Sequence, residues 1–278
     1  MTDARQLDRA ELDNLLALLE DRDEVTFEVV SDRVFALGWN ALDYFFRNVY
    51  RQTEPYRRSF VLKRICQMSS LLAYKELLDL MRTGPDLYVP DGMYFLTRIM
   101  EPELTPDAFR GCYEDVGNSL LCELTDSMTA VERVEMLNYT MYDKYGFALS
   151  APSGKEDEPN VLLPRLLKRR KGGTVGLSCV YFLLASYAGL PVYPVFPKSP
   201  GYFVTWMEQG RSLFTIDVGN HGRISDPVPR SVWKDTPLMG TDQTILYIYA
   251  AALKRFSPAN STRLTDILLT RALDVLRV

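Results

Sequence analysis

The sequence predicts an α+β fold in which helices at both ends of the chain flank a small antiparallel sheet. Three observations carry this prediction. Apolar residues recur at helical spacing through the first half of the chain. An almost wholly apolar stretch, residues 177–188, then predicts a central helix that is buried on all sides. Directly after it the pattern alternates with a period of two over three short segments, which is typical of strands.

The first part of the chain predicts a packed helical bundle. Two apolar stripes at helical spacing lie on either side of the polar residues 20–24. The stripes are Leu12, Leu15, Leu16 and Leu19, and Phe27, Val30, Val34 and Leu37. Gly38 is placed to end the second helix, and a third stripe begins at Ala41. The two short helices resemble a single HEAT-like pair, but solenoids need several repeats, so a bundle is the better interpretation.

Capping signals place the next helices. We expect one helix within residues 55–81 and a chain break at residues 88–92, which contain Pro and Gly. Thr105 followed by Pro106 is typical of a helix N-terminus. Thr129 and Glu132 have the spacing of a capping box and open another helix.

The second half predicts a loop, the buried helix, strands and two final helices. We expect the polar residues 150–159 to form a loop, and a helix over residues 161–171 to follow it. Gly189 ends the buried helix. The expected strands are residues 192–196, 202–207 and 212–216, of which the last two form a hairpin, and the expected final helices are residues 241–256 and 262–278. We divide the chain into a helical domain, residues 1–125, and a second domain, residues 126–278.

Composition excludes several functions. The net charge of −4 argues against a protein that coats nucleic acid, and no run of about 18 apolar residues could span a membrane. One histidine, His221, excludes a multi-histidine zinc site, and we expect neither metal nor cofactor. The start of the chain lacks the apolar segment of a signal peptide. The scattered cysteines predict buried free thiols and a cytoplasmic protein, with a secreted disulfide protein as the alternative: Cys66, Cys112, Cys122 and Cys179.

Short motifs in a fixed order carry a family resemblance. They are Thr129–Asn138, Tyr145–Phe147, Asn160-Val161, Arg169–Gly172, Gly176–Ser178 with Tyr181, Gly189–Pro191, Pro200–Phe203, Ile216-Asp217 and Asn220–Arg223. In this order they resemble the bacterial SirB-type transglutaminase-like family, which has a papain-like core. The resemblance covers most of the chain. It implies a nucleophilic Cys at the start of the buried helix, a His on the following strand and an orienting Asp on the next.

The resemblance maps the three catalytic positions onto Thr174, Tyr202 and Asp217. Two of them have changed, because Thr replaces the nucleophilic Cys and Tyr replaces the His. Thr at a helix start is an ordinary cap, and the pKa of Tyr is too high for a good base at neutral pH. The resemblance therefore implies the fold without the reaction, and predicts a non-catalytic binding module for a protein or peptide.

Alternatives stay open at this point. A cysteine-dependent hydrolase or acyltransferase would use a displaced Cys179 with His221, although the apolar helix around Cys179 favours a core thiol and the Gly-Asn-His-Gly context of His221 favours an exposed turn. A helical adaptor would instead capture its partner through residues 1–125. Asp217 keeps a role in the site, or it caps the turn that follows it.

Overall fold

The computed structural model describes residues 8–84, 87–150, 161–234, 240–256 and 262–277, and it confirms the α+β fold class. The helices are α1 (Arg9–Leu18), α2 (Glu24–Leu37), α3 (Trp39–Gln52), α4 (Arg58–Met81), α5 (Val89–Met100), α6 (Pro106–Glu123), α7 (Ala130–Asn138), α8 (Leu163–Arg169), α9 (Thr174–Tyr187), α10 (Asp242–Arg255) and α11 (Arg263–Leu276). The strands are β1 (Ala148–Leu149), β2 (Lys171–Gly172), β3 (Val192–Val195), β4 (Phe203–Glu208), β5 (Arg211–Asp217) and β6 (Arg223–Ser225). None of the helices in these ranges is long and apolar enough to cross a membrane. Apart from its first residue, the loop expected at residues 150–159 lies outside the described residues.

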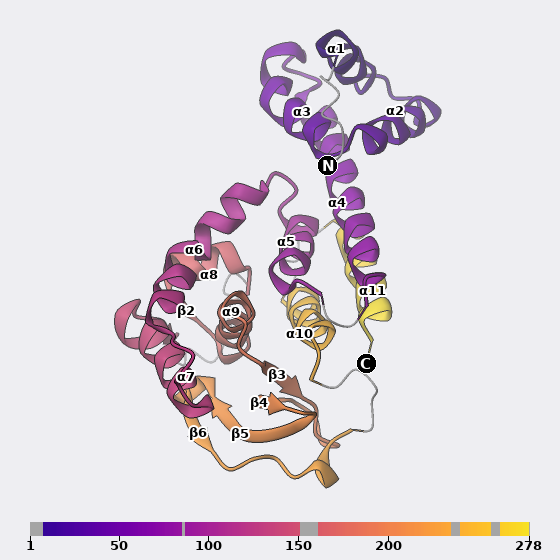
Figure 1. The fold of residues 1–278 in the computed structure, drawn as a ribbon. Coiled ribbons are helices and arrows are strands. Elements are labelled where there is room, and N and C mark those ends of the chain that lie inside the picture. Colours follow the sequence, from indigo (N-terminus) through magenta and orange to yellow (C-terminus); the bar gives the residue numbers. More distant parts are fainter. Residues whose placement is uncertain (1–7, 85–86, 151–160, 235–239, 257–261, 278) are drawn as a thin grey trace.

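Helices α1 to α3 and the first half of α4 form the expected N-terminal bundle (Figure 1). Its core contains the predicted leucines of α1, and Gly38 ends α2 with a φ of 73°. Helix α4 continues beyond this bundle. Its residues up to Leu72 belong to the first core, and Ala73 and Leu77 belong to the core of the rest of the molecule. The domain boundary between residues 125 and 126 stays a prediction.

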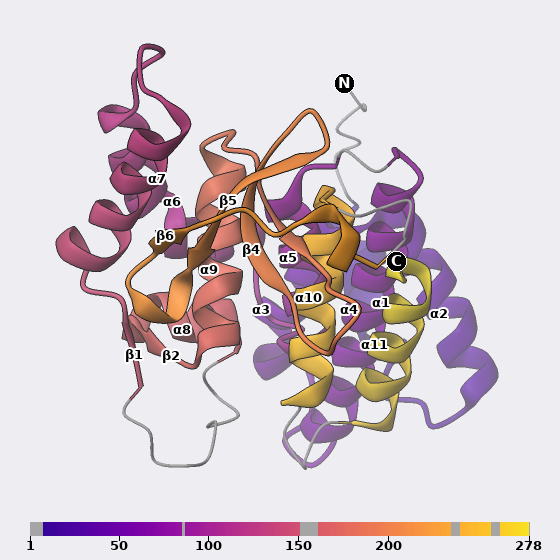
Figure 2. The ribbon, with the colours of Figure 1, turned by 90° about the horizontal axis from the view of Figure 1, so that it is seen from below.

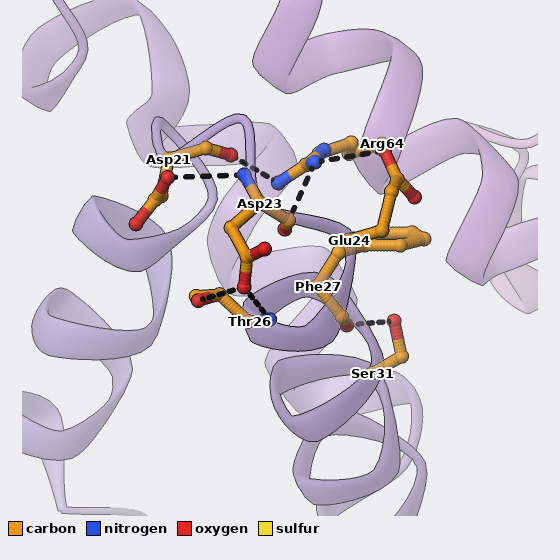
Figure 3. A network of polar contacts seen from close by, with 7 residues as sticks. All are labelled: Asp21, Asp23, Glu24, Thr26, Phe27, Ser31 and Arg64. Atoms are coloured by element: carbon orange, nitrogen blue, oxygen red, sulfur yellow. Dashed lines mark hydrogen bonds and ion pairs between the residues drawn. The ribbon is translucent and has the colours of Figure 1, made fainter.

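Arg64 on α4 holds the connection between α1 and α2 in place (Figure 3). Its guanidinium donates hydrogen bonds to the backbone oxygens of Asp21 and Asp23, and forms an ion pair of 3.3 Å with Glu24. The same group lies over the rings of Phe27 and Phe60, at 4.7 and 4.5 Å from their centroids. The planar guanidinium thus satisfies the backbone of a tight turn and packs between two aromatic rings.

Arg64→Lys is expected to lower the free energy of unfolding by about 1–2 kcal/mol, because an ammonium group can replace neither the paired hydrogen bonds nor the stacking. Urea unfolding followed by circular dichroism measures this difference. Arg33→Lys in α2 is the matched control, since Arg33 is half exposed and pairs with Glu11 at the surface. The control should change stability by less than about 0.5 kcal/mol. Equal effects of the two substitutions would contradict the proposed role of Arg64.

The break expected at residues 88–92 is wrong, because α5 begins at Val89. Pro90 lies in the first turn, where a helix tolerates the missing N–H group of Pro. Gly92 is part of the helix for a packing reason: a Cβ at this position would overlap the side chain of Leu246 on α10. Gly92 therefore marks a close contact between α5 and α10 and not a turn.

Four strands form an antiparallel sheet in the order β3-β4-β5-β6. The β4–β5 hairpin is confirmed, and its turn has positive φ at Gln209 and Gly210, as a tight hairpin turn requires. Strand β6 was not expected from the sequence. The sheet lies across α9 and α10 (Figure 2), and its inward side chains join the core of α9. The helix that the sequence marks as buried is thus central, with ten of its residues buried.

The capping box at Thr129 and Glu132 is confirmed at the start of α7. The α-helix that begins there ends at Asn138 and is followed by a π-helix over Tyr139–Lys144. A π-helix turns side chains away from their α-helical directions and often accompanies functional sites. Here it carries Tyr142, which contacts the loop after β5.

Candidate functional site

Helix α9 begins at Thr174, and Gly173 occupies the N-cap position. Thr174 is therefore the first helical residue and is exposed, so the prediction that Thr174 caps the helix is wrong. The preceding residues form β2, which pairs in parallel with β1 and places the start of the helix. The position at which the family resemblance implies a nucleophile is thus at the surface and carries a hydroxyl group.

Asp217 ends β5, and the structure brings it next to Thr174. A Cβ atom on Gly219 would lie 3.4 Å from Oδ1 of Asp217 and 3.5 Å from Oγ1 of Thr174. The Asp217 carboxylate and the Thr174 hydroxyl therefore both lie beside Gly219, which has no side chain. Asp217 and Thr174 are both exposed. The Asp217 side chain makes no capping hydrogen bond to the turn that follows, so the capping alternative is wrong.

The loop from Asp217 to Gly222 is fixed by hydrogen bonds from distant residues. The backbone N–H of Gly222 donates to the Asp217 carbonyl at 2.9 Å. Tyr142 donates its hydroxyl to the Val218 carbonyl at 2.8 Å, and Asn138 donates its amide to the Gly222 carbonyl at 2.9 Å. Burial raises the pKa of the Tyr142 hydroxyl, and the nearby Asp217 charge raises it further, so this donor keeps its proton. The loop is held rigidly where it presents Asp217.

Asn138 is itself held by α9. The Tyr181 hydroxyl donates to Oδ1 of Asn138 at 2.8 Å, and burial raises the pKa of Tyr181 well above its ordinary value. The roles of Asn138, Tyr142 and Tyr181 were not predicted from the sequence. Asn138 and Tyr181 lie in stretches that carry the family resemblance, which is the signal the sequence offered for them.

His221 lies in the turn of this loop, as expected, with a left-handed φ of 51°. It is exposed, and its ring stacks on Tyr142 with a centroid distance of 5.1 Å and an interplanar angle of 6°. No hydrogen bond joins His221 to Cys179, although both residues are described. The structure therefore does not bring these two candidates together as a hydrogen-bonded pair.

Tyr202, which stands where the resemblance implies a His, directly precedes β4 and is half-buried against the core. Its ring contacts Phe182 and Phe196 at centroid distances of 6.4 and 6.5 Å. Burial, followed by the nearby Cys179, raises the pKa of the Tyr202 hydroxyl, and a hydrogen bond with Ser178 opposes this shift. Tyr202 therefore stays protonated at neutral pH, and its half-buried ring packs against the core.

Cys179 is fully buried in α9, and burial raises the pKa of its thiol to about 12. All four cysteines are free, as expected, but the expectation that all are buried is wrong. Cys66 and Cys112 are half-buried, and Cys122 is exposed. Within the described ranges, no group of three or more His, Cys, Asp or Glu side chains is placed to hold a metal ion.

A comparison with known protein families gave one match. Residues 109–236 match the model of the transglutaminase-like superfamily. The match extends from α6 to beyond β6 and includes all five candidate residues: Thr174, Cys179, Tyr202, Asp217 and His221. This part of the chain is therefore a transglutaminase-like superfamily domain. No curated protein and no solved structure gave a significant match.

Proposed function

We propose that the transglutaminase-like domain is a non-catalytic binding module for a protein or peptide, and a divergent member of the bacterial SirB-type family. The proposal is supported by the residues that stand where the resemblance implies the two reacting groups. Thr174 stands at the start of α9 and Tyr202 stands before β4, while Asp217 is retained. In a catalytic triad the Asp orients the His and does not itself react. The retained residue can accept hydrogen bonds without supporting the reaction.

The surface around Gly219 has properties that suit binding. The Thr174 hydroxyl and the Asp217 carboxylate are exposed beside a residue without a side chain, which leaves room for a ligand backbone. Asn138 and Tyr142 fix the loop that presents them. A preformed polar site loses little conformational entropy when it binds, and a carboxylate accepts strong hydrogen bonds from peptide N–H groups.

The alternative is a cysteine-dependent hydrolase or acyltransferase that uses Cys179 with His221. It requires a thiolate that a substrate can reach. Cys179 is fully buried with a pKa of about 12, and the His221 ring rests on Tyr142 at the surface. At pH 7 the thiolate fraction of Cys179 is roughly a thousandfold lower than that of a thiol with the ordinary pKa of 9.0. These properties favour binding over thiol chemistry.

Native thiol reactivity separates the two functions. With the folded protein at pH 7, we expect iodoacetamide to alkylate Cys122 at least about a hundredfold faster than Cys179, because only the former is exposed. Mass spectrometry of tryptic peptides measures both rates in one sample. Denaturation in urea is the control and should make the two rates similar. Alkylation of Cys179 that is faster than that of Cys122 would support the hydrolase and overturn the proposal.

Binding is tested by comparing three variants of the full chain as bait. Asp217→Asn and Thr174→Val alter the proposed site with little change in volume, and Cys179→Ala alters only the buried thiol. We expect a partner captured by the unaltered chain to be lost with the two site variants and kept with Cys179→Ala. If all three variants still capture the partner, the site around Gly219 does not bind it. Partner capture by residues 1–125 alone would favour the helical adaptor instead.

We further propose a cytoplasmic location, which the free cysteines support because disulfides are rare in reducing compartments. Fractionation of cells that express the tagged chain tests it, and recovery of the chain outside the cytoplasm would contradict it.

A further inference from the structure

Two surfaces of the N-terminal bundle lack a partner within the described part of the chain. One lies on the outer side of α2, and the other lies where α3 meets α4. Figure 1 shows α2 and α3 on opposite sides of the bundle. Neither surface belongs to the candidate site, which is built from α7, α9 and the β5–β6 loop.

The first surface, the acidic valine face, consists of Val25, Glu28, Val29 and Asp32. These residues share one side of α2, because positions three, four and seven apart align on a helix. Val25 and Val29 are each 66% exposed, which is high for branched apolar side chains. Glu28 and Asp32 are exposed beside them and form no ion pair with any described residue.

The second surface, the arginine–tyrosine corner, consists of Arg47, Tyr50 and Arg51 on α3 and Arg58 on α4. Tyr50 is 60% exposed, and the Arg58 guanidinium lies 5.9 Å from its ring centroid. The three arginines form no ion pair with described residues. Glu54 is the one carboxylate between positions 47 and 58 of the sequence. The corner is therefore basic and aromatic in a chain whose net charge is −4.

We propose that the acidic valine face of one copy of this chain docks on the arginine–tyrosine corner of a second copy. The two surfaces are complementary in charge and in apolar contact. Carboxylates on α2 match guanidinium groups, which bind them through paired hydrogen bonds. The two valines match the exposed ring of Tyr50, and Tyr and Arg are enriched at protein interfaces. This inference goes beyond the proposed binding function and does not depend on it.

The two docking surfaces differ, so the contact joins copies head to tail. Such contacts extend into open chains unless the geometry closes a ring. Exposed ion pairs are individually weak and are screened by salt. Self-association is therefore expected to be concentration-dependent and to disappear at high ionic strength.

Sedimentation equilibrium of the full chain tests this inference. In dilute buffer the average mass should rise with protein concentration, and in roughly 0.5 M NaCl it should return to that of one chain. Arg47→Gln/Arg51→Gln and Glu28→Gln/Asp32→Asn each neutralise one surface at exposed positions. Each should weaken self-association about tenfold or more. Arg263→Gln/Arg271→Gln on α11 is the matched control, which removes two exposed arginines elsewhere and should leave the mass unchanged.

A mixture of the two neutralised variants gives the sharpest result. Each variant keeps the surface that the other has lost, so the mixture should form a dimer that does not grow further. A single-chain mass at every concentration in dilute buffer would overturn the proposal. So would an equal loss of association in the α11 control, or the absence of a dimer in the mixture. Circular dichroism confirms that each variant is folded before its mass is compared.

Discussion

Replacing Arg98 with alanine is expected to lower the free energy of unfolding by about 3–5 kcal/mol. Arg98 on α5 is fully buried. Its guanidinium donates to Ser69 at 3.1 Å and to the Tyr94 hydroxyl, pairs with Asp43 at 3.4 Å, and lies 3.8 Å from the ring centroid of Trp39. Alanine would leave these partners unsatisfied and create a cavity.

The position of Arg98 explains the size of this effect. Asp43 and Trp39 lie on α3 in the N-terminal bundle, whereas Ser69 is on α4 and Tyr94 is on α5. The buried guanidinium therefore joins α3 to the helices that continue into the main core. Urea unfolding of Arg98→Ala measures the loss. Arg82→Ala is the control, because Arg82 is exposed, and it should change stability by less than about 1 kcal/mol. A loss for Arg98→Ala as small as that of the control would show that the contact between the two parts does not depend on Arg98.

Gly222→Ala is expected to lower the free energy of unfolding by about 2–4 kcal/mol and to displace the loop that presents Asp217. Gly222 has a φ of 72°, which alanine adopts at a cost. A Cβ at this position would also overlap the side-chain amide of Asn138. Because Asn138 binds both Gly222 and Tyr181, its movement would break both hydrogen bonds.

Gly210→Ala is the matched control for this substitution. Gly210 also has a φ of 72°, but a Cβ there would meet no atom within 4 Å. It should cost about 1 kcal/mol, from backbone strain alone. Loop displacement has its own readout, since His221 is the single histidine and its ring proton signals in NMR are unambiguous. Stacked on Tyr142, these signals should shift in Gly222→Ala and stay unchanged in Gly210→Ala. An effect of Gly222→Ala no larger than that of the control would contradict the clamp by Asn138.

Local signals in the sequence predicted the elements whose causes are local. The capping box at Thr129, the helix end at Gly38 and the β4–β5 hairpin all depend on residues a few positions apart. The buried character of α9 is equally visible, because its apolar residues occur on all sides of the helix. The π-helix and β6 were not predicted from the sequence. No residue pattern at positions 139–144 indicates a π-helix, and β6 is a short strand that forms only by pairing with β5.

The candidate site was predicted in part. The sequence marked Thr174, Tyr202 and Asp217 through a resemblance, and residues 109–236 do match a transglutaminase-like superfamily model. What it could not show is which of them meet. The structure sets Thr174 and Asp217 around Gly219 and packs Tyr202 between phenylalanines. It also shows that Asn138 holds a loop 84 positions further along the chain.

The sequence by itself determined the α+β class, the order of the main elements, and that Thr174 and Tyr202 stand where the resemblance implies a Cys and a His. These follow from periodicity, capping and residue identity, all of which are local properties of a chain. Only the tertiary structure decided that Cys179 is buried in the core, that the His221 ring stacks on Tyr142, and that Arg98 joins α3 to α5. Burial and contact between distant residues depend on how the elements pack, and no local pattern encodes them.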